Sequence, residues 1–249
     1  MSAWPAGYGR HILASVDSTL NEAARLASKL AAPTWILAHE QTGARGRRGR
    51  AWSMPKGNFA ATLTMRPNEP PAIVALRSFV ASLALFDALV DCTGRAEPFA
   101  LKWPNDVLLN GGKLAGILLE SSTQPDGTTP LSIGIGVNLV AAPSKDEVEE
   151  GALAPVDLLS ETGARVTPEE FLELLAVSYA RWENSFTTYG FAPTREAWLA
   201  RAARLGEPIR ARTTNDELFG TFETIDDDGK LILLTSSGRH AIPAADVFF

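Results

Sequence analysis

The spacing of apolar and polar positions divides most of the chain into predicted strands and helices. Apolar residues that alternate with polar ones, or form short runs, predict strands; such segments are 10–16, 34–40, 58–66, 98–121 and 131–139. Apolar residues three and four positions apart predict helices; these segments are 17–31, 72–90, 168–190 and 195–204. This order of elements predicts an α+β fold, a mixed β-sheet with helices packed against it.

The segment 98–121 is expected to contain more than one strand. Pro104 marks a bend, and the sequence Asn110-Gly111-Gly112 between two apolar runs predicts a hairpin turn.

The last part of the chain has a different pattern. Beyond Gly206, short alternating strands are joined by turns at 226–229 and 236–238. About 45 residues with this pattern predict a small β-barrel. We therefore expect a large domain at 1–190, a connecting helix at 191–204 and a small β domain at 205–249.

The most apolar long segment, 72–90, is interrupted by Arg77 and Asp87, which predicts a core helix rather than a membrane span. The first residues lack a basic segment followed by an apolar run, so no secretory leader is expected. Cys92 is the single cysteine and cannot form an internal disulfide, which fits a reducing compartment. We expect a cytoplasmic protein with no membrane partner.

The balance of charges limits the partners. The chain has 23 Lys and Arg against 29 Asp and Glu, a net charge of −6, whereas a protein that binds nucleic acid over much of its surface is expected to be basic. Four arginines nevertheless lie within six residues: Arg45, Arg47, Arg48 and Arg50. This contrast predicts a local site for an anion.

The segment 41–52, which we call the arginine loop, holds these four arginines with three glycines and no apolar periodicity. It is expected to be a loop that is mobile until its charge is neutralised. Glycines permit close backbone approach and guanidinium groups pair with carboxylates and phosphates, which suits a polyanionic small molecule. An arginine-rich arm for RNA and a solvated loop are the alternatives that composition leaves open.

Two of the six lysines, Lys102 and Lys113, lie among apolar residues of the segment 101–121. A lysine beside glycines at a strand start can face a carboxylate or phosphate, although a solvated hairpin lysine has the same pattern. Asn105 and Asp106 either form a turn or face a metal ion beside a nucleotide.

Two further segments carry candidate ligand contacts. Ser18 and Thr19 stand at a predicted helix start, where one is expected to cap the helix and either hydroxyl can bind a neutral polar ligand. Gly134 and Gly136 let a flat group lie against their strand, and Asn138 can read an amide edge. Ordinary capping and packing are the alternatives.

The order of these segments resembles that of the biotin protein ligases, which adenylate biotin and transfer it to a lysine of a carboxylase carrier domain. That family has a Ser-Thr pair opening a helix, a Gln before a GRGRRGR-type loop with a following Trp, a KWPND segment, a KLAGILxE strand and a GxG[IV]N strand. This chain has all five in that order between Ser18 and Asn138. The resemblance extends, with weaker motifs, to a C-terminal SH3-like barrel.

The resemblance also implies ligands and residue roles. The ligands are ATP, biotin and Mg²⁺, and the protein partner is a biotin carboxyl carrier domain. Biotin contacts are implied for Ser18, Thr19, Leu20, Gln41, Arg45, Gly46, Arg47, Lys113 and Gly116. Contacts to ATP or the adenylate are implied for Arg47, Arg48, Arg50, Trp52, Lys113 and Asn138. Lys113, Arg47 and Arg48 are the implied catalytic groups, and Asn105 and Asp106 the metal-facing pair.

Two positions depart from the family's pattern. Ala44 stands where the family usually has glycine, so backbone strain is expected there unless Gly43 adopts the unusual angle. Leu20 stands where many relatives have a polar residue, which removes a side-chain contact to the ligand.

A lipoate protein ligase of the same fold is the nearest alternative, and an RNA-binding module is the alternative from a different class. Octanoyl transferases of this fold use a nucleophilic cysteine, and Cys92 lies away from every motif. Only 17 residues precede Ser18, too few for the DNA-binding domain that many biotin ligases carry, so no nucleic-acid partner is expected. Strand edges of the sheet leave room for a homodimer.

Overall fold

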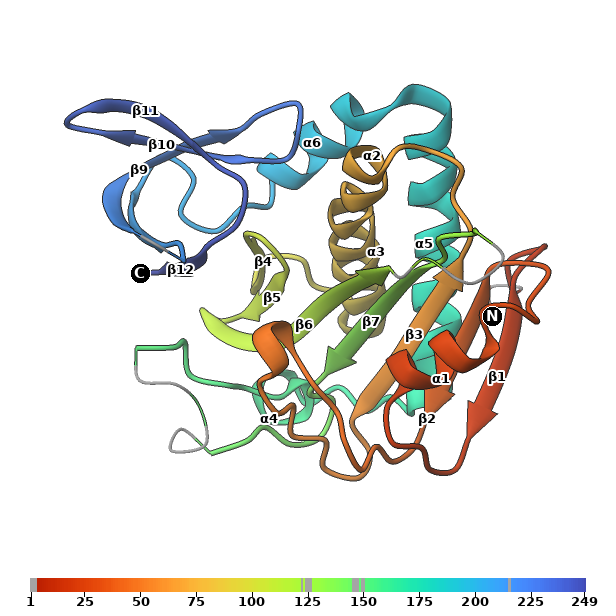
Figure 1. Cartoon of the computed structure of the whole chain (residues 1–249). Helices are drawn as coiled ribbons and strands as arrows, with labels where there is room; N and C mark the ends of the chain where they lie inside the picture. The colour runs from red at the N-terminus through yellow and green to blue at the C-terminus, as the bar shows by residue number, and fades with distance from the viewer. Residues whose placement is uncertain (1–3, 122, 124–126, 145–147, 149–150, 215) are drawn as a thin grey trace.

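The computed structural model describes residues 4–121, 123, 127–144, 148, 151–214 and 216–249. Within this part of the chain, seven strands form a mixed sheet in the order β1-β2-β3-β7-β6-β5-β4 (Figure 1). β1 is parallel to β2, and all other neighbours are antiparallel. The strands are β1 Gly9–Leu13, β2 Thr34–Ala38, β3 Phe59–Met65, β4 Phe99–Lys102, β5 Asp106–Leu109, β6 Gly112–Ser121 and β7 Leu131–Val137.

The predicted hairpin connects β5 and β6. Asn110 and Gly111 form its two-residue loop and have φ angles of 49° and 80°. A tight hairpin needs positive φ at both loop positions, which Asn-Gly tolerates best. The turn pairs Leu109 with Gly112, and a register shift between Val107 and Leu108 then places Asp106 of β5 opposite Gly116 of β6.

Helices α3, Arg77–Thr93, and α5, Pro168–Tyr189, cover one face of the sheet, and the short helix α1, Thr19–Leu26, lies on the other (Figure 1). The side chains of Phe59 and Phe171 meet edge to face between the sheet and α5, with ring centroids 5.0 Å apart. The face bearing α1 is therefore the one on which a ligand site can form. The predicted mixed sheet with packed helices is confirmed.

Several predicted helix boundaries were wrong. α1 ends at Leu26 rather than at 31, and Leu76 separates α2, Pro71–Ala75, from α3. The helix expected at 195–204 is α6, Phe191–Leu199, which starts directly after Gly190 because a proline within the first helical turn is tolerated. A fourth element, α4 at Leu158–Thr162, was not predicted.

By length and composition, the segment Pro71–Thr93 could cross a membrane, with a mean hydropathy of 2.0. In the structure 67% of that window is buried, and α3 packs against α5, α6 and strands β4 to β6. Its burial fits the predicted core helix.

In the C-terminal part that the structure describes, five strands form an antiparallel sheet in the order β11-β10-β9-β8-β12. They are β8 Pro208–Arg212, β9 Glu217–Ile225, β10 Leu231–Thr235, β11 Gly238–Ile242 and β12 Asp246–Phe248. Trp103 Nε1 donates a hydrogen bond to the Gly229 carbonyl at 3.2 Å, and Trp198 packs edge to face on Phe222. These contacts fix the small sheet beside the β4–β5 end of the large one.

Candidate active site

A cavity of about 420 Å³ lies on the side of the sheet where α1 packs. Its walls are the start of α1, the arginine loop, residues 151–155 and strand β12 of the C-terminal sheet. The candidate ligand-binding segments of the sequence therefore meet in one cavity, and strand β12 of the small domain completes its wall.

The floor of the cavity is a row of small residues that crosses the sheet. The strand register places Ala60, Gly136 and Gly116 side by side, and Asp106 continues the row. The indole of Trp52 lies on this row, because a Cβ built at Gly136 would be 2.7 Å from Trp52 Cε2 and one at Gly116 would be 3.3 Å from Cζ3. Because these glycines have no side chain, the Trp52 ring can pack directly on the strands.

Leu20 and Gly116 both line the cavity, where each is in contact with a neighbouring element. A Cβ at Gly134 would be 3.0 Å from Leu20 Cγ, so Leu20 packs on strand β7. The side chain nearest to Gly116 on this face is the Trp52 ring.

The start of α1 gathers four polar side chains, of which those of Ser18, Thr19 and Thr62 are buried and that of Gln41 is half-buried. Ser18 caps the helix and accepts a hydrogen bond from the Leu20 amide at 3.3 Å. Gln41 Oε1 accepts from the Thr19 amide at 2.7 Å and from Thr19 Oγ1 at 3.1 Å. Thr62 Oγ1 of β3 donates to Thr19 Oγ1 at 2.8 Å. The predicted residues Ser18, Thr19 and Gln41 are brought together at one end of the cavity.

The arginine loop is folded back on itself. Gly46 N donates to the Arg50 carbonyl at 2.8 Å and Trp52 N to the Ala44 carbonyl at 3.0 Å, around a short 3₁₀ turn at Arg47–Gly49. The prediction of a loop is confirmed, and the carboxylates of Glu120 and Asp246 form ion pairs with its arginines.

The predicted backbone strain at Ala44 does not occur. Neither Gly43 nor Ala44 has a positive φ; Arg48 and Gly49 have φ of 57° and 72° instead. The alanine at position 44 is therefore compatible with the loop, and the left-handed residues lie at its tip.

Arg45 points away from the other arginines. It forms a two-pronged ion pair with Glu120 at 3.1 and 2.8 Å and donates to Asn21 Oδ1 at 2.8 Å. These bonds attach the loop to β6 and α1, beside the Ser18 end of the cavity.

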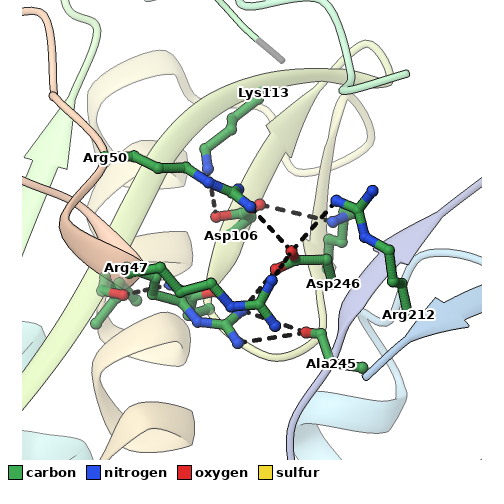
Figure 2. Close-up of polar contacts among 11 residues, drawn as sticks. Arg47, Arg50, Asp106, Lys113, Arg212, Ala245 and Asp246 are labelled. Carbon is green, nitrogen blue, oxygen red and sulfur yellow. Dashed lines mark hydrogen bonds and ion pairs between the residues drawn. The ribbon is translucent and has the colours of Figure 1, made fainter. Parts of the chain in front are cut away.

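The remaining three arginines of the loop reach Asp246 of the C-terminal sheet. Figure 2 shows Arg47 and Arg50 on this side of the loop. Arg48 Nη1 lies 2.6 Å and Arg50 Nη2 3.0 Å from Asp246 Oδ2, while Arg47 Nη1 lies 3.7 Å from Oδ1. Arg47 also donates to the Ala245 carbonyl at 3.3 and 3.4 Å. Burial acts to raise the pKa of the Asp246 carboxyl, but the hydrogen bond from Arg50 and the three positive charges hold this pKa below its usual value.

Lys113 and Lys102 flank a second carboxylate, that of Asp106. Figure 2 shows Lys113 beside this carboxylate. Lys113 Nζ is 2.8 Å from Asp106 Oδ1, and Lys102 Nζ is 3.6 Å from Oδ2. Burial would raise the pKa of Asp106, but the charges of both lysines hold it below its usual value. Burial lowers the pKa of Lys102 despite its carboxylate neighbour. The site thus offers ammonium groups next to the sheet floor.

The contacts of Asn105 and Asp106 do not support the predicted metal-facing pair. Asn105 Nδ2 donates to the Ile117 carbonyl at 2.5 Å, and its Oδ1 lies 3.5 Å from Arg47 Nη1. Asp106 is paired with lysines. Among the described residues, no group of three or more His, Cys, Asp and Glu side chains could hold a metal ion.

Asn138 is 2% exposed at the end of β7 and lines the cavity. Its Nδ2 donates to the Val156 carbonyl at 3.0 Å, whereas its Oδ1 has no hydrogen-bond partner within the described chain. A buried acceptor without a partner is costly, so this oxygen is suited to a donor on a ligand.

Three residues of the site were missed or left out by sequence reasoning. Thr62 and Asp246 carry no local motif, because one lies in an ordinary buried strand and the other follows a barrel turn far along the chain. The sequence assigns no ligand role to Lys102, although its position among apolar residues, like that of Lys113, is a signal that could have indicated one.

Comparison with protein families agrees with this geometry. The family model described as "Biotin/lipoate A/B protein ligase family" matches residues 12–138. The model described as "Biotin protein ligase C terminal domain" matches residues 205–249.

Individual relatives span the chain. A biotin–[acetyl-CoA-carboxylase] ligase of Paracoccus denitrificans is 58% identical over 96% of this chain and 99% of its own length. The bifunctional ligase/repressor BirA of Bacillus subtilis is 31% identical over 95% of this chain and 71% of its own length. The structure resembles that of the biotin protein ligase from Aquifex aeolicus in complex with biotin and ATP, with a TM-score of 0.81, 26% identity, and coverage of 96% and 98% of the two chains.

Proposed function

The chain belongs to the biotin/lipoate A/B protein ligase family, and from that membership we infer that it is a biotin protein ligase. It activates biotin with ATP to biotinyl-5′-AMP and transfers the biotinyl group to a lysine of a biotin carboxyl carrier domain of a carboxylase. The observation that carries this function is the single cavity in which the Ser18 cluster, the arginine loop and Lys113 meet.

The Ser18 end of the cavity fits the neutral, polar ureido group of biotin. The hydroxyl of Ser18, the hydroxyl of Thr19 and the amide of Gln41 are held by the hydrogen bonds described above. Preordered donors and acceptors reduce the entropy that a ligand must lose on binding. The apolar Leu20 and the Trp52 ring then cover the length of the sheet floor beside it.

The opposite end of the cavity fits the reacting anions. A carboxylate oxygen of biotin attacks the α-phosphorus of ATP and pyrophosphate leaves, so negative charge must be tolerated throughout the step. Lys113, Lys102 and Arg47 place positive charge there without reorganisation, which is the usual source of electrostatic catalysis. In the second step a neutral lysine amine of the carrier attacks the acyl carbon and AMP leaves.

For the nucleotide, Trp52 offers an aromatic face and Asn138 an unpartnered Oδ1 that can accept from the adenine amino group. Mg²⁺ would arrive with ATP as part of the substrate. The carboxylates of Asp106 and Asp246 are occupied by Lys and Arg, so the described side chains do not fit a resident metal ion.

The decisive test is transfer. Purified protein is incubated with ATP, Mg²⁺, biotin and a biotin carboxyl carrier domain, and the carrier's mass is measured. We expect addition of one biotinyl group that depends on ATP and Mg²⁺. Lipoate in place of biotin serves as the second arm; preferential lipoylation, or no labelling with either acid, would refute the assignment.

We propose the cytoplasm as the place of this reaction, because ATP and carboxylases are supplied there. A homodimer formed through a strand edge of the sheet stays a prediction, which the molar mass in solution can test.

Gln41→Leu is expected to raise the KM for biotin about 10-fold, because the Thr19 amide and hydroxyl lose their shared acceptor. The KM for ATP should change little. Steady-state kinetics with each substrate varied in turn separates the two. Glu40→Gln, at the exposed neighbouring position, is the control and should behave as the parent does.

Arg47→Gly is expected to release biotinyl-AMP into solution. Arg47 contacts Asn105, Ala245 and Asp246, so its loss removes a contact of the loop to each domain and weakens its closure. Labelling of lysines on an added bystander protein should rise by roughly 10-fold, which corresponds to a loss of about 1.4 kcal/mol from the free energy that stabilises the closed loop. Arg48→Gly is the comparison: it removes one ion pair but relieves a left-handed φ, so it should leak less. Equal leakage from both variants would argue against this role of Arg47.

A further inference from the structure

Asp246 is the meeting point of cations from two domains. Its carboxylate lies 2.6 Å from Arg48 Nη1, 3.0 Å from Arg50 Nη2 and 3.7 Å from Arg47 Nη1, all in the arginine loop. Arg212 of the neighbouring strand β8 lies 3.6 Å away (Figure 2). The side chain of Asp246 is only 12% exposed and lines the cavity. The Asp246 carboxylate therefore occupies a position among four guanidinium groups where an anionic ligand could bind instead.

Asp246 offers these four arginines the two oxygens of one carboxylate. A polyphosphate offers several anionic oxygens in place of two, and guanidinium groups bind phosphate as well as they bind carboxylate. The same guanidinium groups can therefore exchange Asp246 for the phosphates of a nucleotide.

The contacts are weak enough individually to be exchanged. The side chains of Arg48 and Arg50 are 43% and 48% exposed, and exposed ion pairs contribute little one at a time because water screens them. Acting together on one loop, with the bond from Arg47 to the Ala245 carbonyl, they are sufficient to bias its position. This combination holds the loop without locking it.

We propose that Asp246 is a positioning residue of the arginine loop: its carboxylate stands in for the phosphates, keeps the loop folded over the cavity before ATP binds, and gives up the guanidinium groups when the triphosphate arrives. The proposal rests on the ligase function given above. In this proposal the C-terminal domain stabilises the conformation of the arginine loop in the ligand-free protein.

The first test is limited digestion of the ligand-free protein with trypsin, which cleaves a folded protein after arginine and lysine where a segment can open. Asp246→Asn should be cut within residues 45–50 roughly 5- to 10-fold faster than the parent, the scale expected when several weak ion pairs are lost together. Asp246→Glu should restore much of the protection. Glu223→Gln, which removes an ion-paired carboxylate of the same sheet that does not line the cavity, should be cut at the parent rate.

The second test uses inorganic pyrophosphate and calorimetry. Because Asp246 competes for the guanidinium groups, Asp246→Asn should bind pyrophosphate roughly 5-fold more tightly than the parent and Glu223→Gln equally. A purely structural role would weaken binding instead. Unchanged cleavage within the loop, or unchanged or weaker pyrophosphate binding in Asp246→Asn, would overturn the proposal.

Carrier biotinylation by the parent protein is measured in parallel. If the parent labels the carrier while Asp246→Asn behaves like the parent in both tests, the role of Asp246 is wrong and the ligase function stands. If the parent does not label the carrier, the function itself is wrong, whatever the digestion shows.

Discussion

Lys113→Gln is expected to slow biotinyl-AMP formation by about 10²- to 10³-fold, the usual effect of removing one electrostatic group from a reacting centre. Lys113 Nζ is held 2.8 Å from Asp106 Oδ1 at the edge of the cavity floor, so its charge is placed before the substrates bind. Glutamine keeps most of the length of the side chain but cannot offset the repulsion between the biotin carboxylate and ATP. Isotope exchange between pyrophosphate and ATP measures the step directly.

The substitution also has a structural cost that must be separated from catalysis. Without Lys113, the ion pair left to the buried Asp106 within the described part of the chain is the longer one with Lys102 at 3.6 Å, and an underpaired buried carboxylate destabilises the fold. The double variant Lys113→Gln/Asp106→Asn removes this charge, so its melting temperature should recover while its exchange rate stays low. Lys56→Gln, at an exposed lysine close to the arginine loop, is the matched control. Activity that recovered together with stability would show that Lys113 acts through folding alone.

Gly136→Ala is expected to raise the KM for ATP about 10-fold or more. The new Cβ would be 2.7 Å from Cε2 and 2.8 Å from Nε1 of Trp52, closer than any side chain tolerates, and overpacking of this kind costs about 1–3 kcal/mol. The indole must move. Because Trp52 is the last residue of the arginine loop and its N donates to the Ala44 carbonyl, this movement also disturbs the loop. The KM for biotin should change less, because the Ser18 cluster lies at the other end of the cavity.

Two further variants test whether the clash with the ring is the cause. Gly116→Ala places a Cβ 3.3 Å from the same ring, so its effect should be smaller. Trp52→Phe shortens the ring, and combined with Gly136→Ala it should bind ATP better than Gly136→Ala alone, which is non-additive behaviour of side chains in contact. Additive losses would mean that residue 136 and the ring do not interact in this way.

Much of the site could be read from the sequence, because its residues lie in short local segments. The Ser18-Thr19 cap, the arginine loop and the β5–β6 hairpin each carry turn or capping chemistry that is decided within a few residues. Their order along the chain then indicated the family. The fold class followed from periodicity and is confirmed.

The contacts between distant segments could not be predicted. Nothing near Asp246 indicates that it meets arginines about 200 positions earlier, and nothing near Asp106 shows that lysines rather than a metal ion would be its partners. Similarly, Gly-x-Gly in β7 indicated a flat neighbour, but only the tertiary fold shows that Trp52 and Leu20 fill the space. Helix ends were misplaced where a single leucine or a tolerated proline decided the boundary.

The β5–β6 hairpin has a consequence for the order in which this protein folds. Its two-residue loop brings together Asp106 and Lys113, which are close neighbours in the chain, whereas the rest of the floor needs β7 to pair with β6 and with β3 across longer connections. Closing a short loop loses little chain entropy and is fast, while distant pairings are slow. During refolding, the charged pair is therefore expected to assemble before the chamber that will hold its substrates.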